Sequence, residues 1–105
     1  HRISIANMVV DSDALEAVVD GVSLALPRKQ FQLLELLARR KNHMTPKRMI
    51  EEALYGFDDD VSANSIEAQI SKLRRALKSA GAGVVLETRR GIGYRLTALG
   101  AAAPH

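Results

Sequence analysis

Residues 65–77 have the sequence SIEAQISKLRRAL, in which apolar side chains recur at intervals of three and four positions. In a helix of 3.6 residues per turn these side chains share one narrow face. They are Ile66, Ile70, Leu73 and Leu77. Ser62 is a suitable N-cap for this helix, and Gly81 suits its C-terminal end. The sequence therefore predicts a helix from about residue 62 to residue 79 that packs through one side only.

The opposite face of this helix has the composition of a surface that reads DNA. It contains small, amide, hydroxyl and cationic side chains: Asn64, Ala68, Ser71, Lys72, Arg75 and Lys78, with Glu67 and Arg74 on one flank. Small residues permit close approach to a groove, and Asn, Ser and Lys bond to base edges or phosphates. A solvated helix usually alternates acids with bases, whereas residues 70–78 contain four bases and no acid. We interpret the helix as a DNA-reading element, the alternative being an ordinary solvated face.

A basic hairpin follows the helix. The apolar segments 84–86 and 94–96 flank a turn that contains Arg89, Arg90 and two glycines. Glycine lets the backbone turn sharply, and an arginine at such a tip can enter the minor groove of A·T-rich DNA. The alternative is a charged edge strand that only protects against aggregation.

The segment before these elements changes its period once. Residues 2–26 form short β-branched runs separated by turn formers, including an Asp20-Gly21 hairpin signal, and predict a small antiparallel sheet that includes Leu15. Pro27 then begins a helix with a broad apolar stripe at residues 31–38. Thr45 and Pro46 predict the N-cap and first position of a short second helix. The predicted buried face of that helix comprises Met49, Ile50, Ala53 and Leu54.

Composition and charge restrict the class of protein. The 105 residues suit one α+β domain at residues 1–97, with a disordered or artificially added tail at 98–105. The absence of cysteine excludes disulfides and fits a reducing cytoplasm, and no apolar run is long enough for a membrane span. Residues 1–61 have a formal charge of −2 and residues 62–105 a charge of +5. A positive charge concentrated in one stretch favours a phosphate-backbone partner.

Catalytic chemistry finds little support in the sequence. Asp58, Asp59 and Asp60 are adjacent on a loop and lack the spacing of a calcium loop, so a metal-dependent hydrolase is disfavoured. No serine has a histidine in a nucleophile pattern, and His43 is isolated. We expect no catalytic, cofactor or metal site and no enzyme activity. The remaining alternative is an adaptor domain that binds protein and no nucleic acid, for which a neutral or acidic helix at residues 62–79 would be expected.

The chain resembles the OmpR/PhoB-type effector domains of two-component response regulators over about residues 2–97. The resemblance rests on SIEAQISKLRRAL at 65–77, ETRRGIGYRL at 87–96 and LPRKQFQLLELLARRKNHMTPKRMIEEALYG at 26–56. It implies a winged helix-turn-helix with an N-terminal four-stranded antiparallel sheet, three helices and a C-terminal hairpin wing. It also implies that the third helix enters the major groove of double-stranded DNA and the wing the minor groove.

The resemblance assigns roles to residues and partners. The DNA-binding residues are expected to be Asn64, Ser65, Glu67, Ala68, Ser71, Lys72, Arg74, Arg75, Lys78, Thr88, Arg89 and Arg90. The loop expected to contact RNA polymerase comprises Tyr55, Gly56, Phe57, Asp58, Asp59 and Asp60, and continues to Val61. Two copies would bind direct repeats head to tail, and a receiver domain addressed by a sensor kinase normally precedes this module.

The sequence departs from the family pattern at four positions. Pro27 stands where a capping Thr or Ser is usual, and Gln30 where Glu is usual. Ser71 and Lys72 replace frequent arginines. Because lysine cannot form the planar two-pronged contact of arginine, these replacements are expected to alter base preference.

Overall fold

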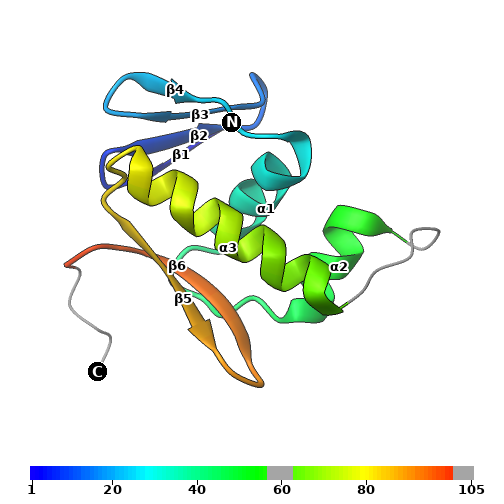
Figure 1. Cartoon of the computed structure of the whole chain (residues 1–105). Helices are drawn as coiled ribbons and strands as arrows, with labels where there is room; N and C mark the ends of the chain where they lie inside the picture. Colours follow the sequence, from blue (N-terminus) through cyan, green and yellow to red (C-terminus); the bar gives the residue numbers. More distant parts are fainter. Residues whose placement is uncertain (57–62, 101–105) are drawn as a thin grey trace.

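The computed structural model describes residues 1–56 and 63–100, which form a four-stranded sheet, three helices and a hairpin in chain order (Figure 1). The elements are β1 (Arg2–Ile5), β2 (Met8–Asp11), β3 (Glu16–Val19), β4 (Val22–Leu24), α1 (Arg28–Arg39), α2 (Lys47–Tyr55), α3 (Ala63–Ser79), β5 (Val84–Arg89) and β6 (Gly93–Ala98). This order confirms the predicted winged-helix architecture. No helix within the described residues is long and apolar enough to cross a membrane.

The N-terminal sheet is a meander in which each strand pairs antiparallel with the next. Its side chains alternate as the period of two requires, so that Met8 and Val10 are fully buried while Val9 between them is half-buried. The Asp20-Gly21 hairpin is confirmed by the pairing of Val19 with Val22. Leu15 differs from the expectation: it lies in the turn before β3, with φ 54° and 71% of its surface exposed.

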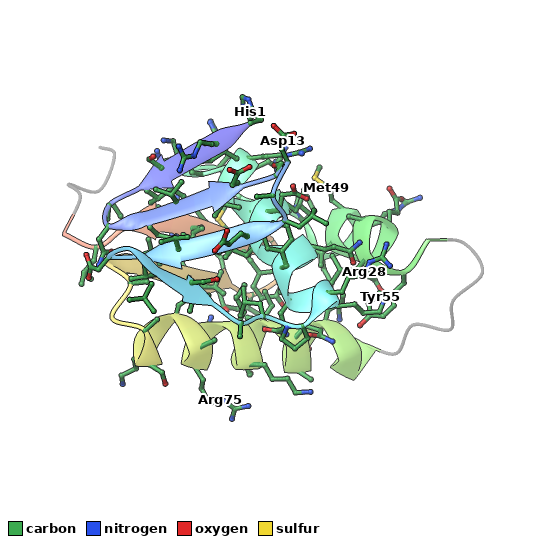
Figure 2. The ribbon with its side chains drawn as sticks, turned by 90° about the horizontal axis from the view of Figure 1, so that it is seen from above. His1, Asp13, Arg28, Met49, Tyr55 and Arg75 are labelled. Atoms are coloured by element: carbon green, nitrogen blue, oxygen red, sulfur yellow. The ribbon has the colours of Figure 1, made fainter. Side chains whose placement is uncertain are left out.

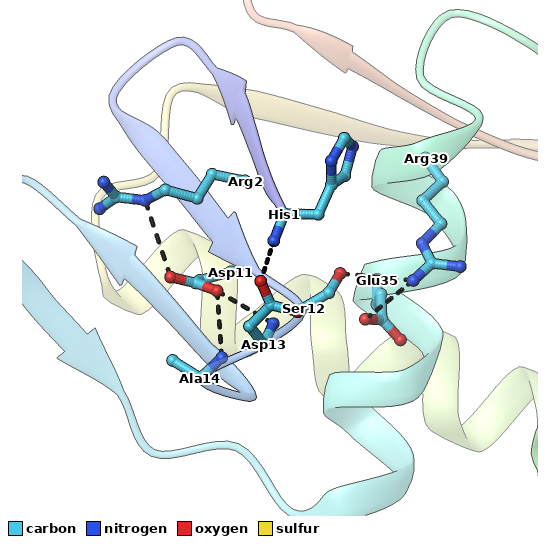
Figure 3. Close-up of polar contacts among 8 residues, drawn as sticks. All are labelled: His1, Arg2, Asp11, Ser12, Asp13, Ala14, Glu35 and Arg39. Atoms are coloured by element: carbon cyan, nitrogen blue, oxygen red, sulfur yellow. Dashed lines mark hydrogen bonds and ion pairs between the residues drawn. The ribbon is translucent and has the colours of Figure 1, made fainter.

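Polar contacts secure the end of the sheet beside α1 (Figure 3). The Asp11 carboxylate accepts hydrogen bonds from the backbone N–H groups of Asp13 and Ala14, both at 3.0 Å, and so closes the β2–β3 turn. These bonds, with Arg2 nearby, hold the pKa of Asp11 below its usual value. Arg39 at the end of α1 lies 3.4 Å from both Glu35 and the Ser12 hydroxyl. The turn and the helix are thereby joined at the surface.

The helices pack around α1, which contacts α2, α3 and the first two strands of the sheet. The apolar stripe predicted for α1 is buried except for the half-buried Leu36. In α2 only Ile50 and Leu54 are buried, whereas Met49 is half-buried and Ala53 is exposed, contrary to the prediction. The two buried side chains lie four residues apart and therefore on one face of this short helix.

Two predicted boundaries are corrected, one at the start of α2 and one at the start of the tail. Thr45 does not cap α2 with its side chain; its residue is fully buried, and its hydroxyl accepts a hydrogen bond from Arg40 Nε at 3.1 Å. Pro46 occupies the N-cap position instead. At the C-terminal end of the chain, Ala98 pairs with Val84 inside β6, so the expected tail does not begin at residue 98.

Asn7 joins the sheet to the loop between α3 and β5. Its side-chain amide donates to Asp20 at 2.9 Å and to the Gly81 carbonyl at 3.0 Å, and its carbonyl accepts from Gly83 N–H at 2.6 Å. The loop that sets the direction of the hairpin is therefore tied to two turns of the N-terminal sheet.

The Asn7→Ala variant is expected to lose about 1–3 kcal/mol of unfolding free energy, because the partly buried Gly83 N–H and the exposed Gly81 carbonyl lose their partner. Urea denaturation measures this loss. Ser4→Ala, an exposed change in the preceding strand, is the matched control and is expected to stay within about 0.5 kcal/mol of wild type. Equal stability of the two variants would contradict the role of Asn7.

Candidate nucleic-acid interface

Helix α3 has the two faces that the sequence predicts. Its inner face is buried, with exposures of 3% or less at Ile66, Ile70, Leu73 and Leu77. The outer face is exposed at Ala68, Ser71, Lys72, Arg75 and Lys78. Figure 2 shows Arg75 pointing away from the body of the domain. The cationic groups of this face are thus available to a partner outside the domain.

The outer face keeps its positive charge within the described part of the chain. None of Lys72, Arg75 and Lys78 forms an ion pair with another described residue. Asn64 and Ser65 belong to the first turn of α3, and their side chains lie outside the described part. A row of unpaired cations on one helix face favours binding to a polyanion.

The hairpin β5–β6, called the wing below, presents Arg90 at an exposed tip of Arg90, Gly91 and Ile92. Arg89 is exposed too, but its guanidinium lies 3.2 Å from Glu87. Arg95 Nη2 lies 2.7 Å from the same carboxylate, and this hydrogen bond is the main reason that the pKa of Glu87 lies below its usual value. Of the two arginines predicted at the turn, only Arg90 is free of an ion pair within the described residues.

The base of the wing is attached to the segment that precedes α2. Thr45 and Tyr94 exchange two backbone hydrogen bonds, of 2.7 Å and 3.0 Å, in an isolated antiparallel bridge. Gly93 makes this approach feasible, because a Cβ atom at its position would lie 2.2 Å from the Thr45 carbonyl oxygen. Its φ of +149° also suits glycine. The wing is therefore held against the helical core at its base.

Arg74 joins the wing to α3. Its Nε and Nη2 donate to the Leu86 carbonyl oxygen at 3.1 Å and 2.8 Å, and Nη2 also donates to the Thr88 hydroxyl at 2.8 Å. The resemblance assigns both Arg74 and Thr88 to DNA, and in the structure their side chains also bond to each other. This contact depends on how the wing folds back on α3, and no sequence period reveals it.

A hollow of about 610 Å³ lies between the wing, the segment that begins α2 and Glu67 of α3. Among the residues that line it are Lys47, Glu67, Arg90 and Tyr94. Lys47 Nζ lies 4.0 Å from Glu67, so this acid of the interface has a cationic neighbour. Burial, together with Glu67, raises the pKa of Tyr94. Lys47 was not predicted as a site residue, although its place directly after the Thr45-Pro46 helix start was a usable signal.

The loop predicted to contact RNA polymerase is only partly described. Tyr55 is the last residue of α2 and not a loop residue, and Gly56 ends the helix with φ +71°. Lys29 Nζ lies 4.4 Å from the Tyr55 ring centroid and donates to the Leu54 carbonyl at 2.7 Å. Phe57, Asp58, Asp59 and Asp60 lie outside the described residues. Within residues 1–56 and 63–100, no group of three His, Asp or Glu side chains is arranged to hold a metal ion.

Comparison with known proteins gives consistent matches. The family model described as "Transcriptional regulatory protein, C terminal" matches residues 21–96. Response regulator ArlR of Staphylococcus saprophyticus is 36% identical over 94 residues, which are 90% of this chain and 43% of that protein. The chain thus spans less than half the length of this curated relative.

Two solved structures have the same fold. The DNA-binding domain of CpxR from E. coli matches with a TM-score of 0.78 and 27% identity, covering 93% of this chain and 97% of that one. The DNA-binding domain of Klebsiella pneumoniae RstA, solved in complex with the RstA box, also matches with a TM-score of 0.78, at 25% identity. That match covers 91% of this chain and 96% of the RstA chain.

Proposed function

The chain belongs to the family of C-terminal domains of transcriptional regulatory proteins, and we propose that it binds double-stranded DNA sequence-specifically as the output domain of a two-component response regulator. The observation that carries the proposal is that the exposed face of α3 with Lys72, Arg75 and Lys78 occurs together with a basic wing that is hydrogen-bonded to α3 and to Thr45. In this proposal α3 enters the major groove and Arg90 of the wing enters the adjacent minor groove. The relatives named as response regulators and the RstA–DNA complex support it.

The proposed contacts divide by chemistry. Ala68, Ser71 and Lys72 lie on the part of α3 that faces outward and are proposed to meet base edges, together with Asn64 and Ser65. Arg75 and Lys78 are proposed to neutralise phosphates. Glu67 can accept a hydrogen bond from a cytosine amine. Arg74, Thr88 and Arg89 remain proposed contacts to the DNA backbone. In the structure Arg74 of α3 also bonds to Thr88, and Arg89 bonds to Glu87.

Further partners are proposed from the family. Two copies bind direct repeats head to tail, and residues 55–60 contact RNA polymerase. In the whole protein a receiver domain, addressed by a sensor kinase through a phosphorelay, precedes this domain, and the protein acts in the cytoplasm and not as an enzyme. The adaptor alternative is disfavoured, because the third helix is basic and neither neutral nor acidic.

Two substitutions test the proposal on a duplex selected from random double-stranded DNA. Lys72→Ala is expected to weaken binding by about 1–3 kcal/mol and to relax preference at one or two base pairs. Arg90→Ala is expected to weaken binding by a similar amount. This loss is expected to grow with the A·T content of the DNA segment beneath the wing. Arg39→Ala is the matched control, because Arg39 lies by Ser12 at the sheet.

Fluorescence titration at several salt concentrations measures these effects. With about 4–6 phosphates neutralised, log K for wild type is expected to fall with log salt at a slope of about −0.9 per phosphate. A wild-type slope near zero, or unchanged binding by both Lys72→Ala and Arg90→Ala, would refute the proposed mode of binding.

A further inference from the structure

Arg74 differs from the other cations of α3 in having three hydrogen bonds to the wing. Two of them reach one backbone oxygen, that of Leu86, and the third reaches Thr88 Oγ1. The bonds span 12 and 14 residues of sequence, so they join two elements that are separate in the chain. Arg75, the next residue, points outward (Figure 2) and forms no ion pair within the described residues. The two adjacent arginines therefore have different roles.

The contact depends on the shape of the guanidinium and not only on its charge. Arginine presents several N–H donors in a rigid planar fork, and hydrogen bonds from a charged donor are stronger than neutral ones. The Leu86 side chain is buried, with 6% exposure. This burial helps to hold in place the Leu86 carbonyl oxygen to which Arg74 donates. A lysine at this position would keep the positive charge but could not bridge Leu86 O and Thr88 Oγ1 in the same way.

The wing has a second attachment on its other strand. Arg74 holds β5 from the α3 side, while the Thr45–Tyr94 bridge holds β6 from the start of α2. Hydrogen bonds on both strands restrain the hairpin from swinging about its base. They therefore also restrain the distance between the outer face of α3 and the Arg90 tip.

Resting on the proposed function, we infer that Arg74 is a positioning residue that sets the number of base pairs between the major-groove site of α3 and the minor-groove site of the wing. One base-pair step moves the narrow groove by about 3.4 Å along the duplex and turns it around the axis. A fixed wing loses its contact after such a step, whereas a loosened wing follows the groove. Arg74 thus contributes to specificity without reading a base.

The test uses the selected duplex and versions with one base pair inserted or removed between the α3 site and the A·T-rich segment beneath the wing. Wild type is expected to lose about tenfold in affinity with either change. Arg74→Lys is expected to bind the original duplex more weakly, and its loss on the altered duplexes is expected to shrink to about threefold or less. Its salt slope is expected to equal that of wild type, because the charge is retained.

Arg75→Lys is the matched control and is expected to retain the full spacing penalty. Thr88→Val removes one of the three hydrogen bonds and is expected to show an intermediate penalty, so it decides the question if Arg74→Lys does not fold. The inference would be overturned if Arg74→Lys lost as much affinity on the altered duplexes as wild type does. If Arg74→Lys does not fold, the same result with Thr88→Val would overturn it. So would a wild-type domain that tolerates both altered duplexes. Failure of wild type to select any duplex would instead refute the proposed DNA binding itself.

Discussion

Replacing Gly93 by alanine is expected to lower the free energy of unfolding by about 3–5 kcal/mol, because steric overlap and backbone strain act together. The added Cβ would lie 2.2 Å from the Thr45 carbonyl oxygen, 2.7 Å from its carbon and 3.0 Å from Pro46 Cα. All three atoms belong to the backbone, so no side chain can rotate away. The φ of +149° adds strain for any residue with a Cβ atom.

Gly91→Ala provides the matched control in the same turn. Gly91 also has a positive φ, of +77°, but a Cβ at its position would meet nothing within 4 Å. We expect this control to lose only about 1 kcal/mol, the strain of the backbone alone. Urea denaturation compares the two variants, and equal losses would mean that the contact between the wing and Thr45 does not restrict the fold. In the Gly93→Ala molecules that remain folded, we expect DNA affinity to fall about as far as it does in Arg90→Ala, because the wing would be displaced.

The elements that the sequence predicted correctly are those determined by local periodicity. The spacing of Ile66, Ile70, Leu73 and Leu77 specifies which side of α3 is buried, whatever it packs against. The Asp20-Gly21 pair likewise specifies its hairpin through local backbone preferences. The outward position of Lys72 follows from the same helical period. The order of sheet, helices and hairpin and the exposed basic face were therefore predictable from local patterns, whereas the winged-helix arrangement was predicted from the family resemblance.

The partners of individual side chains were not predictable in this way. The Arg74 guanidinium is directed to Leu86 by the approach of two elements separated in the chain. Thr45 has the residue type of a helix cap, but the approach of Tyr94 buries it and gives its backbone another partner. Such contacts depend on tertiary packing, which overrides the local preferences that a sequence shows.

The departure from the family at Gln30 has a local explanation in the structure. Gln30 is 4% exposed, and its side-chain nitrogen donates to the backbone oxygen of Gln69 at 3.1 Å and to the Gln69 side chain. An amide suits this buried place because it supplies a donor to the Gln69 backbone oxygen, whereas an ionised glutamate could not donate to that oxygen and would lose its hydration. Residues 30 and 69 are thus a matched neutral pair between α1 and α3.

The last prediction separates folding from recognition on one helix. Leu73 is fully buried, and Leu73→Ala is expected to cost about 2–5 kcal/mol of unfolding free energy through lost burial and the cavity left behind. Lys72 precedes it on the exposed face, so Lys72→Ala is expected to unfold within about 0.5 kcal/mol of wild type. At urea concentrations below its unfolding transition, Leu73→Ala should still bind the selected duplex nearly as wild type does. Lys72→Ala should bind the duplex poorly although it is stably folded. Urea denaturation and fluorescence titration of both variants measure the two effects. If Lys72→Ala lost DNA binding only because it unfolds, the exposed face of α3 would be assigned wrongly. Lys72 would then support the folded core, as Leu73 does.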